Sequence, residues 1–202
     1  PLGRLCASEA LGEGAIQPGE PGWTKYTKLF IFMNRALIVI DVQKYFLTDE
    51  TKTIVKKISD YLKNNSQKYS AIYFTVFKND SNAPLWKISG WKDCVNSPDI
   101  NLCDEIKEFT NNENLFYKNI LSAIKVPQII QEINKNKISE VHLCGFDTDC
   151  CVLATAYDLF DQGIKPVVLE DLTWSTSEEK LHKPAIQMFK RNIGFVKKTI
   201  RQ

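Results

Sequence analysis

The chain has 202 residues, with 26 lysines and arginines against 24 aspartates and glutamates and a formal net charge of +2. This near balance excludes the strongly basic surface typical of nucleic-acid binding, and no apolar run approaches the roughly 20 residues that cross a bilayer. The length is sufficient for one domain with a substantial core.

The cysteines indicate the cellular compartment. They show neither paired CxxC spacing nor a Cys/His zinc pattern, and no secretory signal is visible. We therefore expect free thiols in a reducing cytoplasm. The six are Cys6, Cys94, Cys103, Cys144, Cys150 and Cys151.

Residues 1–32 differ from the rest of the chain. Their first part is rich in Gly, Pro, Ala and Glu and has no periodicity, whereas Met33 stands directly before a clear strand pattern. We interpret 1–32 as a cloning-derived or upstream extension and 33–202 as the domain. The alternative is a native arm whose last residues, 29–32, pair with a sheet edge.

Strand and helix patterns alternate from residue 35 onward. This alternation predicts a doubly wound α/β fold, a three-layer sandwich with a mostly parallel sheet of about six strands and helices on both faces. We expect the strand order 3-2-1-4-5, with the sixth strand at an edge. The predicted strands are 35–41, 71–77, 115–118, 139–144, 166–170 and 193–197, and the predicted helices are 51–67, 101–109, 127–136, 152–162 and 178–191.

The segment 78–98 lacks a regular pattern and carries Trp86 and Trp91. A structureless stretch of this length is unusual in a compact domain, which indicates a lid or a pocket wall. An ordinary surface loop anchored by two tryptophans is the alternative.

The stretch Gly145–Ala156 follows a buried strand pattern and leads into a helix pattern. Thr148 and Asp149 are good helix N-cap types, so Cys151 is expected at the positive end of a helix, which favours thiolate over thiol. A thiolate beside free backbone N–H groups is suited to attack a carbonyl and hold the resulting oxyanion. A buried cysteine acting as a small hydrophobic residue is the alternative.

Two further side chains are expected near Cys151. Asp41 follows the first strand, and the predicted strand order places it in the same crevice as Cys151. Its carboxylate is suited to accept the thiol proton, and Lys118, at the end of the third strand, to stabilise both negative charges. Alternatively, Asp41 caps a turn and Lys118 is solvated.

Three ordered blocks carry a family resemblance. Ile40–Phe46 (IDVQKYF) looks like a D-x-Q-x-x-F block, and Lys118–Ile124 (KNILSAI) like a K-x-x-x-S-A-F block with Ile124 replacing Phe. Gly145–Val152 (GFDTDCCV) looks like a G-x-x-T-D-x-C-V block. With these blocks, the chain from about Ala36 to Gly194 resembles the isochorismatase-like cysteine hydrolases, which include nicotinamidase and N-carbamoylsarcosine amidohydrolase.

The resemblance implies a catalytic triad of Asp41, Lys118 and Cys151. It also implies an oxyanion hole formed by the backbone N–H groups of Asp147 and Cys151, and a cis peptide bond between Phe146 and Asp147. The implied reaction is cofactor-free hydrolysis of an amide, ureide or carbamoyl C–N bond of a small molecule through a covalent acyl-enzyme. Family members often form dimers or tetramers, so a homo-oligomer is expected, with no nucleic-acid or membrane partner.

The sequence departs from nicotinamidases at the metal-binding motif. Those enzymes carry Asp-x-His and a further His after the second strand, whereas 77–86 contains no histidine, and His142 and His182 lie elsewhere. We therefore predict no metal and argue against nicotinamidase. The presence of Cys151 argues against isochorismatase itself, whose members lack this nucleophile.

Gln43, Asn82, Trp86 and Trp91 are our candidates for the wall of the substrate pocket. Two other functions stay open: a catalytically silent family member that serves as a binding or assembly module, and a redox-sensing thiol pair, Cys150 and Cys151.

Overall fold

The computed structural model describes residues 34–199. Its centre is a six-stranded sheet in the order β3-β2-β1-β4-β5-β6, and every neighbouring pair is parallel. This order confirms the sequence prediction. The expectation for residues 1–32 lies outside the described residues. The strands are β1 (Arg35–Ile40), β2 (Ala71–Phe77), β3 (Leu115–Lys118), β4 (Glu140–Gly145), β5 (Lys165–Thr173) and β6 (Val196–Lys197).

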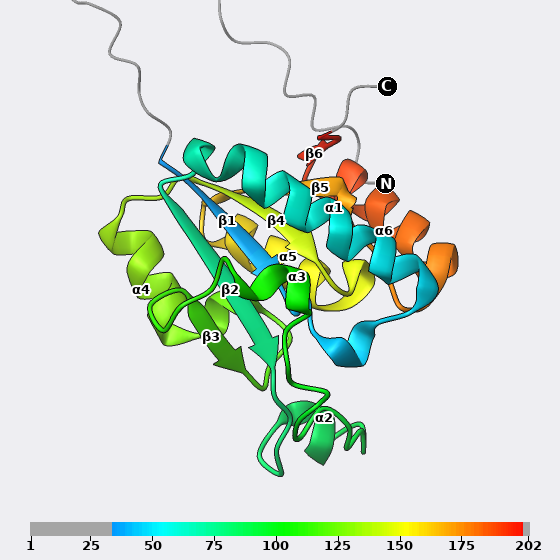
Figure 1. Cartoon of the computed structure of the whole chain (residues 1–202). Coiled ribbons are helices and arrows are strands. Elements are labelled where there is room, and N and C mark those ends of the chain that lie inside the picture. The colour runs from blue at the N-terminus through cyan, green and yellow to red at the C-terminus, as the bar shows by residue number, and fades with distance from the viewer. Residues whose placement is uncertain (1–33, 200–202) are drawn as a thin grey trace, which may run out of the picture. The chain divides into compact units, whose positions relative to one another are not determined.

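Helices cover both faces of the sheet, and Figure 1 shows α1 crossing in front of the strands. One core cluster joins α1 and α3 to one face, and the other joins α4, α5 and α6 to the opposite face. The three-layer prediction is therefore confirmed. The helices are α1 (Asp49–Asn65), α2 (Pro84–Lys87), α3 (Asp104–Lys107), α4 (Pro127–Lys135), α5 (Leu153–Asp161) and α6 (Glu178–Asn192).

The central strand β1 shows why the sequence reads as a continuous apolar run. Successive side chains of a strand point to opposite faces. Leu37 and Val39 enter the cluster with α1, whereas Ile38 and Ile40 enter the cluster with α5. Because both faces are buried, no position in the middle of the strand is left for a polar residue.

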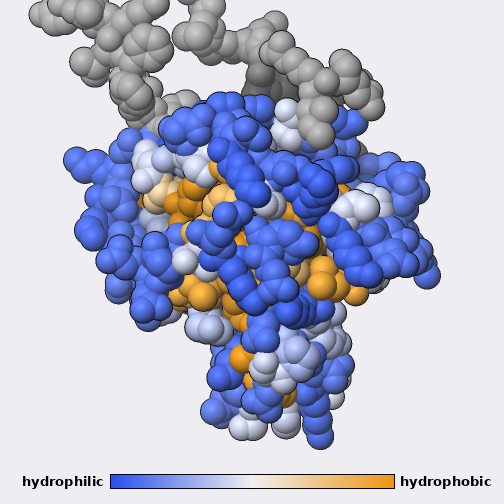
Figure 2. All heavy atoms as spheres, viewed as in Figure 1, coloured by the Kyte–Doolittle hydropathy of each residue, from blue (hydrophilic) through white to orange (hydrophobic). Residues whose placement is uncertain are grey.

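Helix α1 begins at a capping box. The Thr48 hydroxyl accepts from the Thr51 N–H at 3.2 Å, and the Thr51 hydroxyl accepts from the Thr48 N–H at 2.6 Å. Ile54 and Ile58 face the sheet, while the outer face is polar. Figure 2 shows a mainly hydrophilic surface where α1 crosses the viewed side. Because Thr48 is the cap, the helix begins two residues before the predicted start, Thr51.

Some predicted bounds were wrong. The helix expected over 101–109 is the single turn α3, because the N–H groups of Phe109 and Thr110 bind carbonyls three residues back in tight turns. The fifth strand extends to Thr173, which pairs with Gly145 beyond a register shift in β4. Within residues 34–199, no helix has both the length and the apolar character needed to span a membrane.

Gly145 ends β4 with a backbone φ of 109°. A Cβ atom there would lie 2.1 Å from the carbonyl oxygen of Ile40, which is closer than atoms approach. The next residue, Phe146, donates its N–H to that same oxygen at 2.8 Å. The absence of a side chain thus lets the chain that leaves β4 run against the end of β1.

Candidate active site

Three strands deliver the predicted side chains to one end of the sheet. Asp41 follows β1 directly, Lys118 is the last residue of β3, and Cys151 lies in the turn after β4. All three are buried: Asp41 is 0%, Lys118 4% and Cys151 5% exposed. The carboxyl ends of parallel strands meet at one edge of a sheet, which explains why residues so far apart in the sequence converge.

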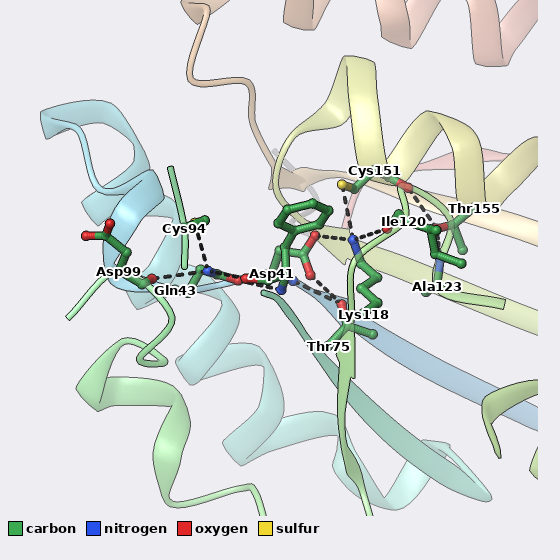
Figure 3. Close-up of polar contacts among 11 residues, drawn as sticks. Asp41, Gln43, Thr75, Cys94, Asp99, Lys118, Ile120, Ala123, Cys151 and Thr155 are labelled. Carbon is green, nitrogen blue, oxygen red and sulfur yellow. Dashed lines mark hydrogen bonds and ion pairs between the residues drawn. The ribbon is translucent and has the colours of Figure 1, made fainter. Parts of the chain in front are cut away.

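Lys118 connects the other two residues (Figure 3). Its Nζ lies 2.6 Å from Asp41 Oδ2 and 3.3 Å from Cys151 Sγ. It also donates to the carbonyl oxygen of Ile120 at 3.1 Å. An ammonium group has three donors, so these contacts fix its position completely.

Asp41 is held from β2. The Thr75 hydroxyl donates to Asp41 Oδ1 at 2.7 Å, and the Asp41 N–H donates to the Thr75 carbonyl at 3.1 Å. Asp41 itself has a φ of 51°, in the left-handed region that few residue types adopt. One carboxylate oxygen is thereby directed to β2 and the other to Lys118.

The electrostatics of Lys118 follow from burial and its two neighbours. Burial disfavours the ammonium charge, but the attraction of Asp41 and Cys151 outweighs it and raises the Lys118 pKa above its ordinary value. Lys118 is therefore positively charged at neutral pH.

The pKa values of the two neighbouring thiols, Cys150 and Cys151, shift in opposite directions. A hydrogen bond with the Cys150 thiol and then burial raise the pKa of Cys151 well above its ordinary value, although Lys118 opposes both effects. The same hydrogen bond lowers the pKa of Cys150. Cys151 thus keeps its proton in the ligand-free protein. The Cys150 hydrogen bond and burial thus act against the thiolate that we expected, whereas Lys118 acts for it.

The segment that carries Cys151 is a π-helical turn, Thr148–Val152, rather than the first turn of α5. The Asp147 carbonyl accepts from the N–H groups of Cys150 and Val152, both at 3.1 Å. Thr148 does not cap the helix with its side chain, which corrects our N-cap prediction. Its hydroxyl instead lies 2.9 Å from His182 Nδ1 and 2.9 Å from the Thr173 hydroxyl.

The peptide bond between Phe146 and Asp147 is cis. The Asp147 carboxylate accepts from the Thr176 N–H at 2.8 Å and from the Thr176 hydroxyl at 2.7 Å. Burial raises the pKa of Asp147 to about 6, although the bonds from Thr176 oppose this rise. The loop after β5 is therefore tied to the turn that carries Cys151.

A cavity of about 260 Å³ opens beside the thiol. Its wall is aromatic and aliphatic except near Cys151, where it is polar, so it suits a small molecule with an apolar body and one polar group. The lining residues are Tyr45, Phe46, Phe77, Leu85, Trp91, Leu121, Asp147, Cys150, Cys151 and Thr176.

Of the four predicted pocket residues, Trp91 lines this cavity and three do not. Gln43 is buried behind it, where its side chain donates to the carbonyls of Phe77 and Asp99 at 3.0 and 3.1 Å. Asn82 is exposed and accepts from a lysine, and Lys92 lies over the Trp86 ring at 5.6 Å. These three side chains are engaged elsewhere in the ligand-free structure, and their contact with a substrate stays a prediction.

Sequence reasoning missed Tyr45, Phe46, Phe77, Leu85, Leu121 and Thr176 as wall residues. The sequence held evidence for three of these residues. Tyr45 and Phe46 belong to the first motif block, and Phe77 ends β2 at the same sheet edge as Lys118. Thr176 follows the longer β5, whose end the sequence did not reveal.

The metal question rests on the donor groups present. Among residues 34–199, no group of three or more His, Cys, Asp or Glu side chains is arranged to hold a metal ion. Asp80, in the segment after β2, accepts instead from the Asn119 side chain at 2.9 Å and the Asn82 N–H at 2.6 Å.

Comparison with known proteins gives a consistent family match. A model of the Isochorismatase domain matches residues 35–200. The uncharacterized isochorismatase family protein PncA of Bacillus subtilis is 34% identical over 83 residues, which are 40% of this chain and 45% of that protein. Isochorismatase domain-containing protein 2 of Rattus norvegicus is 43% identical over 54 residues, 26% of each chain. The matched segments thus span less than half the length of these curated relatives.

Solved structures extend the likeness over the whole fold. Nicotinamidase PncA from Bacillus subtilis superposes with a TM-score of 0.70 at 23% identity, covering 82% of this chain and 100% of that one. N-carbamoylsarcosine amidase from Thermoplasma acidophilum superposes with a TM-score of 0.71 at 21% identity, covering 84% and 99%. At such identities the likeness shows the fold alone.

Proposed function

The chain belongs to the isochorismatase family, and from this premise we propose that it is a cysteine hydrolase of small C–N substrates. The bond cleaved is an amide, ureide or carbamoyl bond, and the route is a covalent acyl-enzyme on Cys151. The observation that carries the proposal is the contact of Lys118 with both Asp41 and Cys151 beside a cavity.

The first half-reaction begins with proton transfer. Because the pKa of the Cys151 thiol is raised, a base is required, and Asp41 takes the thiol proton when substrate excludes water from the cavity. The sulfur then forms a bond to the carbonyl carbon, and the π electron pair moves to the oxygen. The backbone N–H groups of Asp147 and Cys151 are the proposed oxyanion hole.

The intermediate collapses when the carbonyl re-forms and the C–N bond breaks. The nitrogen leaves as ammonia or an amine with the proton that Asp41 held. Water then attacks the thioester while Asp41 accepts one of its protons, and the acid product departs as Cys151 recovers that proton. Lys118 stays protonated throughout and stabilises the successive negative charges of Asp41 and the sulfur.

The magnitudes are consistent with this division of roles. A positioned general base contributes about 10²–10⁴ in rate, and one oxyanion donor contributes about 10²–10³. These effects require fixed geometry, which the three contacts of Lys118 and the Thr75 bond to Asp41 supply.

The test is ammonia release from a panel of small amides, ureides and carbamoyl compounds. We expect release that Cys151→Ala abolishes and Cys150→Ala, the matched neighbouring substitution, leaves measurable. Mass spectrometry of the denatured enzyme quenched during turnover is expected to show an acyl adduct on Cys151. No release from any compound, together with slow alkylation of Cys151, contradicts the proposal and favours a binding module.

The redox function has a separate readout. The lowered pKa of Cys150 and its place in the cavity wall make the thiol pair oxidisable. If the pair is a sensor, peroxide forms a bond between the two sulfurs that dithiothreitol reverses, and amides are not hydrolysed. We expect instead that the reduced protein hydrolyses amides.

A further inference from the structure

A second hollow adjoins the cavity beside Cys151. Its volume is about 470 Å³, and Leu85 and Leu121 line both spaces. We call it the α5 groove. Its lining residues are Pro84, Leu85, Ile88, Ser89, Asn119, Ile120, Leu121, Ser122, Lys125, Ala154, Tyr157 and Asp158.

The α5 groove leads away from the thiols along a helix face. Cys150 lines the cavity, and Ala154 and Tyr157 line the groove. These residues are spaced by four and three, so they lie on one side of the continuous helical segment that the π turn and α5 form. At 1.5 Å per residue, the segment from Cys150 to Tyr157 extends about 10 Å.

The groove is apolar over most of its length. The short helix α2 contributes Leu85, the residue after it is Ile88, and the loop after β3 contributes Ile120. Ile88 is 84% exposed, the largest exposed fraction among the large hydrophobic side chains that the structure describes. Covering such surface with an apolar ligand is favourable by about 25 cal/mol per Å².

The far end of the groove is polar. Lys125 Nζ lies 3.3 Å from Asp158 Oδ2 across it. Along the helical segment, the apolar part of the lining therefore lies between Cys150 and this ion pair.

We propose that the α5 groove binds an elongated apolar group attached to the substrate carbonyl, so that the preferred substrates are amides of extended apolar acids. This inference rests on the proposed function, because it places the amide group in the cavity beside Cys151. The remainder of the acyl group then lies in the α5 groove. An acyl chain stays attached to the enzyme through both half-reactions. Its contacts can therefore contribute to both, whereas contacts to the leaving amine serve only the first.

The experiment is a series of unbranched primary amides from acetamide to decanamide, with kcat/KM measured by ammonia release. We expect kcat/KM to rise about two- to fourfold per methylene, the range for burying one such group, and then to level off when the groove is filled. Ile88→Asp is expected to lower kcat/KM for the longest amides about tenfold relative to that for propanamide. Met188→Asp, at a 44% exposed methionine on α6, is the matched control and is expected to leave the ratio unchanged.

The outcomes separate this inference from the function on which it rests. If no amide releases ammonia, the proposed hydrolase function itself fails. If short amides are cleaved in a Cys151-dependent way but chain length and Ile88→Asp have no effect, the groove inference is overturned and the hydrolase stands. A change in oligomeric mass for Ile88→Asp, without a change in chain-length preference, also overturns it and identifies the groove as a contact between copies.

Discussion

The two ends of the sheet each carry a buried carboxylate in an ion pair, but the two carboxylates differ in what surrounds them. At the amino ends of β1, β4 and β5, Glu140 contacts Arg35, Lys165 and His142. At the carboxyl ends, Asp41 contacts Lys118. The Arg35 and Lys165 side chains are 31% and 39% exposed, whereas the side chains of Asp41 and Lys118 are both 0% exposed and adjoin a thiol at a cavity.

The difference shows that a perturbed, ion-paired carboxylate does not identify a site by itself. Hydrogen bonds from Lys165, His142 and Arg35 outweigh burial and lower the Glu140 pKa to about 2, which is a large perturbation. These contacts join strands β1, β4 and β5 at their ends. The Asp41 pair differs because the Cys151 thiol shares its cation and a ligand-sized space lies beside that thiol.

The largest expected effect is on catalysis at the carboxyl end. Asp41→Asn removes the proposed base and is expected to lower kcat/KM by about 10²–10⁴. It also leaves Lys118 buried without a counter-charge, so unfolding should require about 3–5 kcal/mol less. Steady-state kinetics and urea titration of the same preparation measure both quantities. Retention of full activity would show that Asp41 is not the base.

A double substitution separates the two consequences. Adding Lys118→Met to Asp41→Asn removes the unpaired buried charge, and most of the lost stability, about 3 kcal/mol, is expected to return. Activity is not expected to return, because neither the base nor the cation is present. If the double variant is no more stable than Asp41→Asn alone, the ion pair does not account for the loss.

Removing the carboxylate charge at the amino end should lower stability but leave catalysis unchanged. Glu140→Gln removes the charge shared by Arg35, Lys165 and His142, and we expect a loss of about 1–3 kcal/mol in unfolding free energy. The kcat per folded molecule should stay at the wild-type value because this cluster lies at the other end of the strands. A fall in kcat without a fall in stability would mean that the two ends are coupled.

Acid should weaken the amino-end cluster. Burial lowers the His142 pKa to about 4, despite its bond to Glu140, so between pH 6.5 and 4 the unfolded chain binds a proton that the folded one does not. The Glu140 contribution is complete above pH 4.5 and is lost as pH falls toward 2. Unfolding free energy should therefore decrease from pH 6.5 downward. His142→Asn should flatten the upper part of this decrease, and an unchanged slope would contradict the assignment.

The smallest expected effect concerns the loop after β5. Thr176→Val removes one of two donors to the Asp147 carboxylate and keeps the other. Losing a bond that lowers the Asp147 pKa raises this pKa further, and protonated Asp147 holds the loop less firmly against the turn that carries Cys151, so the acid side of the kcat profile shifts to higher pH. We expect a threefold to tenfold loss of kcat near pH 6, by roughly the net worth of one hydrogen bond. Thr176→Ser should restore the profile.

The strand order and the meeting of Asp41, Lys118 and Cys151 were predictable because they depend on one-dimensional signals. Continuous apolar runs mark strands that are buried on both faces, and the chemically active residues stand at the ends of those runs. Right-handed crossover connections between parallel strands then bring the carboxyl ends of these strands together. No knowledge of side-chain orientation is needed for this step.

The cavity wall and the protonation of Cys151 were not predictable in this way. Gln43 and Tyr45 lie in the same motif block, yet only Tyr45 reaches the cavity, because the chain enters a 3-10 turn after Gln43. Trp91 rather than Trp86 lines it, because the Trp91 ring packs against Tyr45 and Phe77, with ring centroids 5.7 and 5.6 Å apart. The raised pKa of Cys151 depends on the hydrogen bond with Cys150 and on burial by segments that the sequence does not place in space.

Gly145 has a consequence for protein engineering. Its position beside the Ile40 carbonyl leaves no volume for even a methyl group, and its φ of 109° disfavours all other residue types. A randomised library across the turn can therefore vary wall positions such as Cys150 to seek new substrates, whereas codons for anything but glycine at 145 yield mostly misfolded members. Keeping this single codon constant is the simplest way to preserve the diversity of such a library.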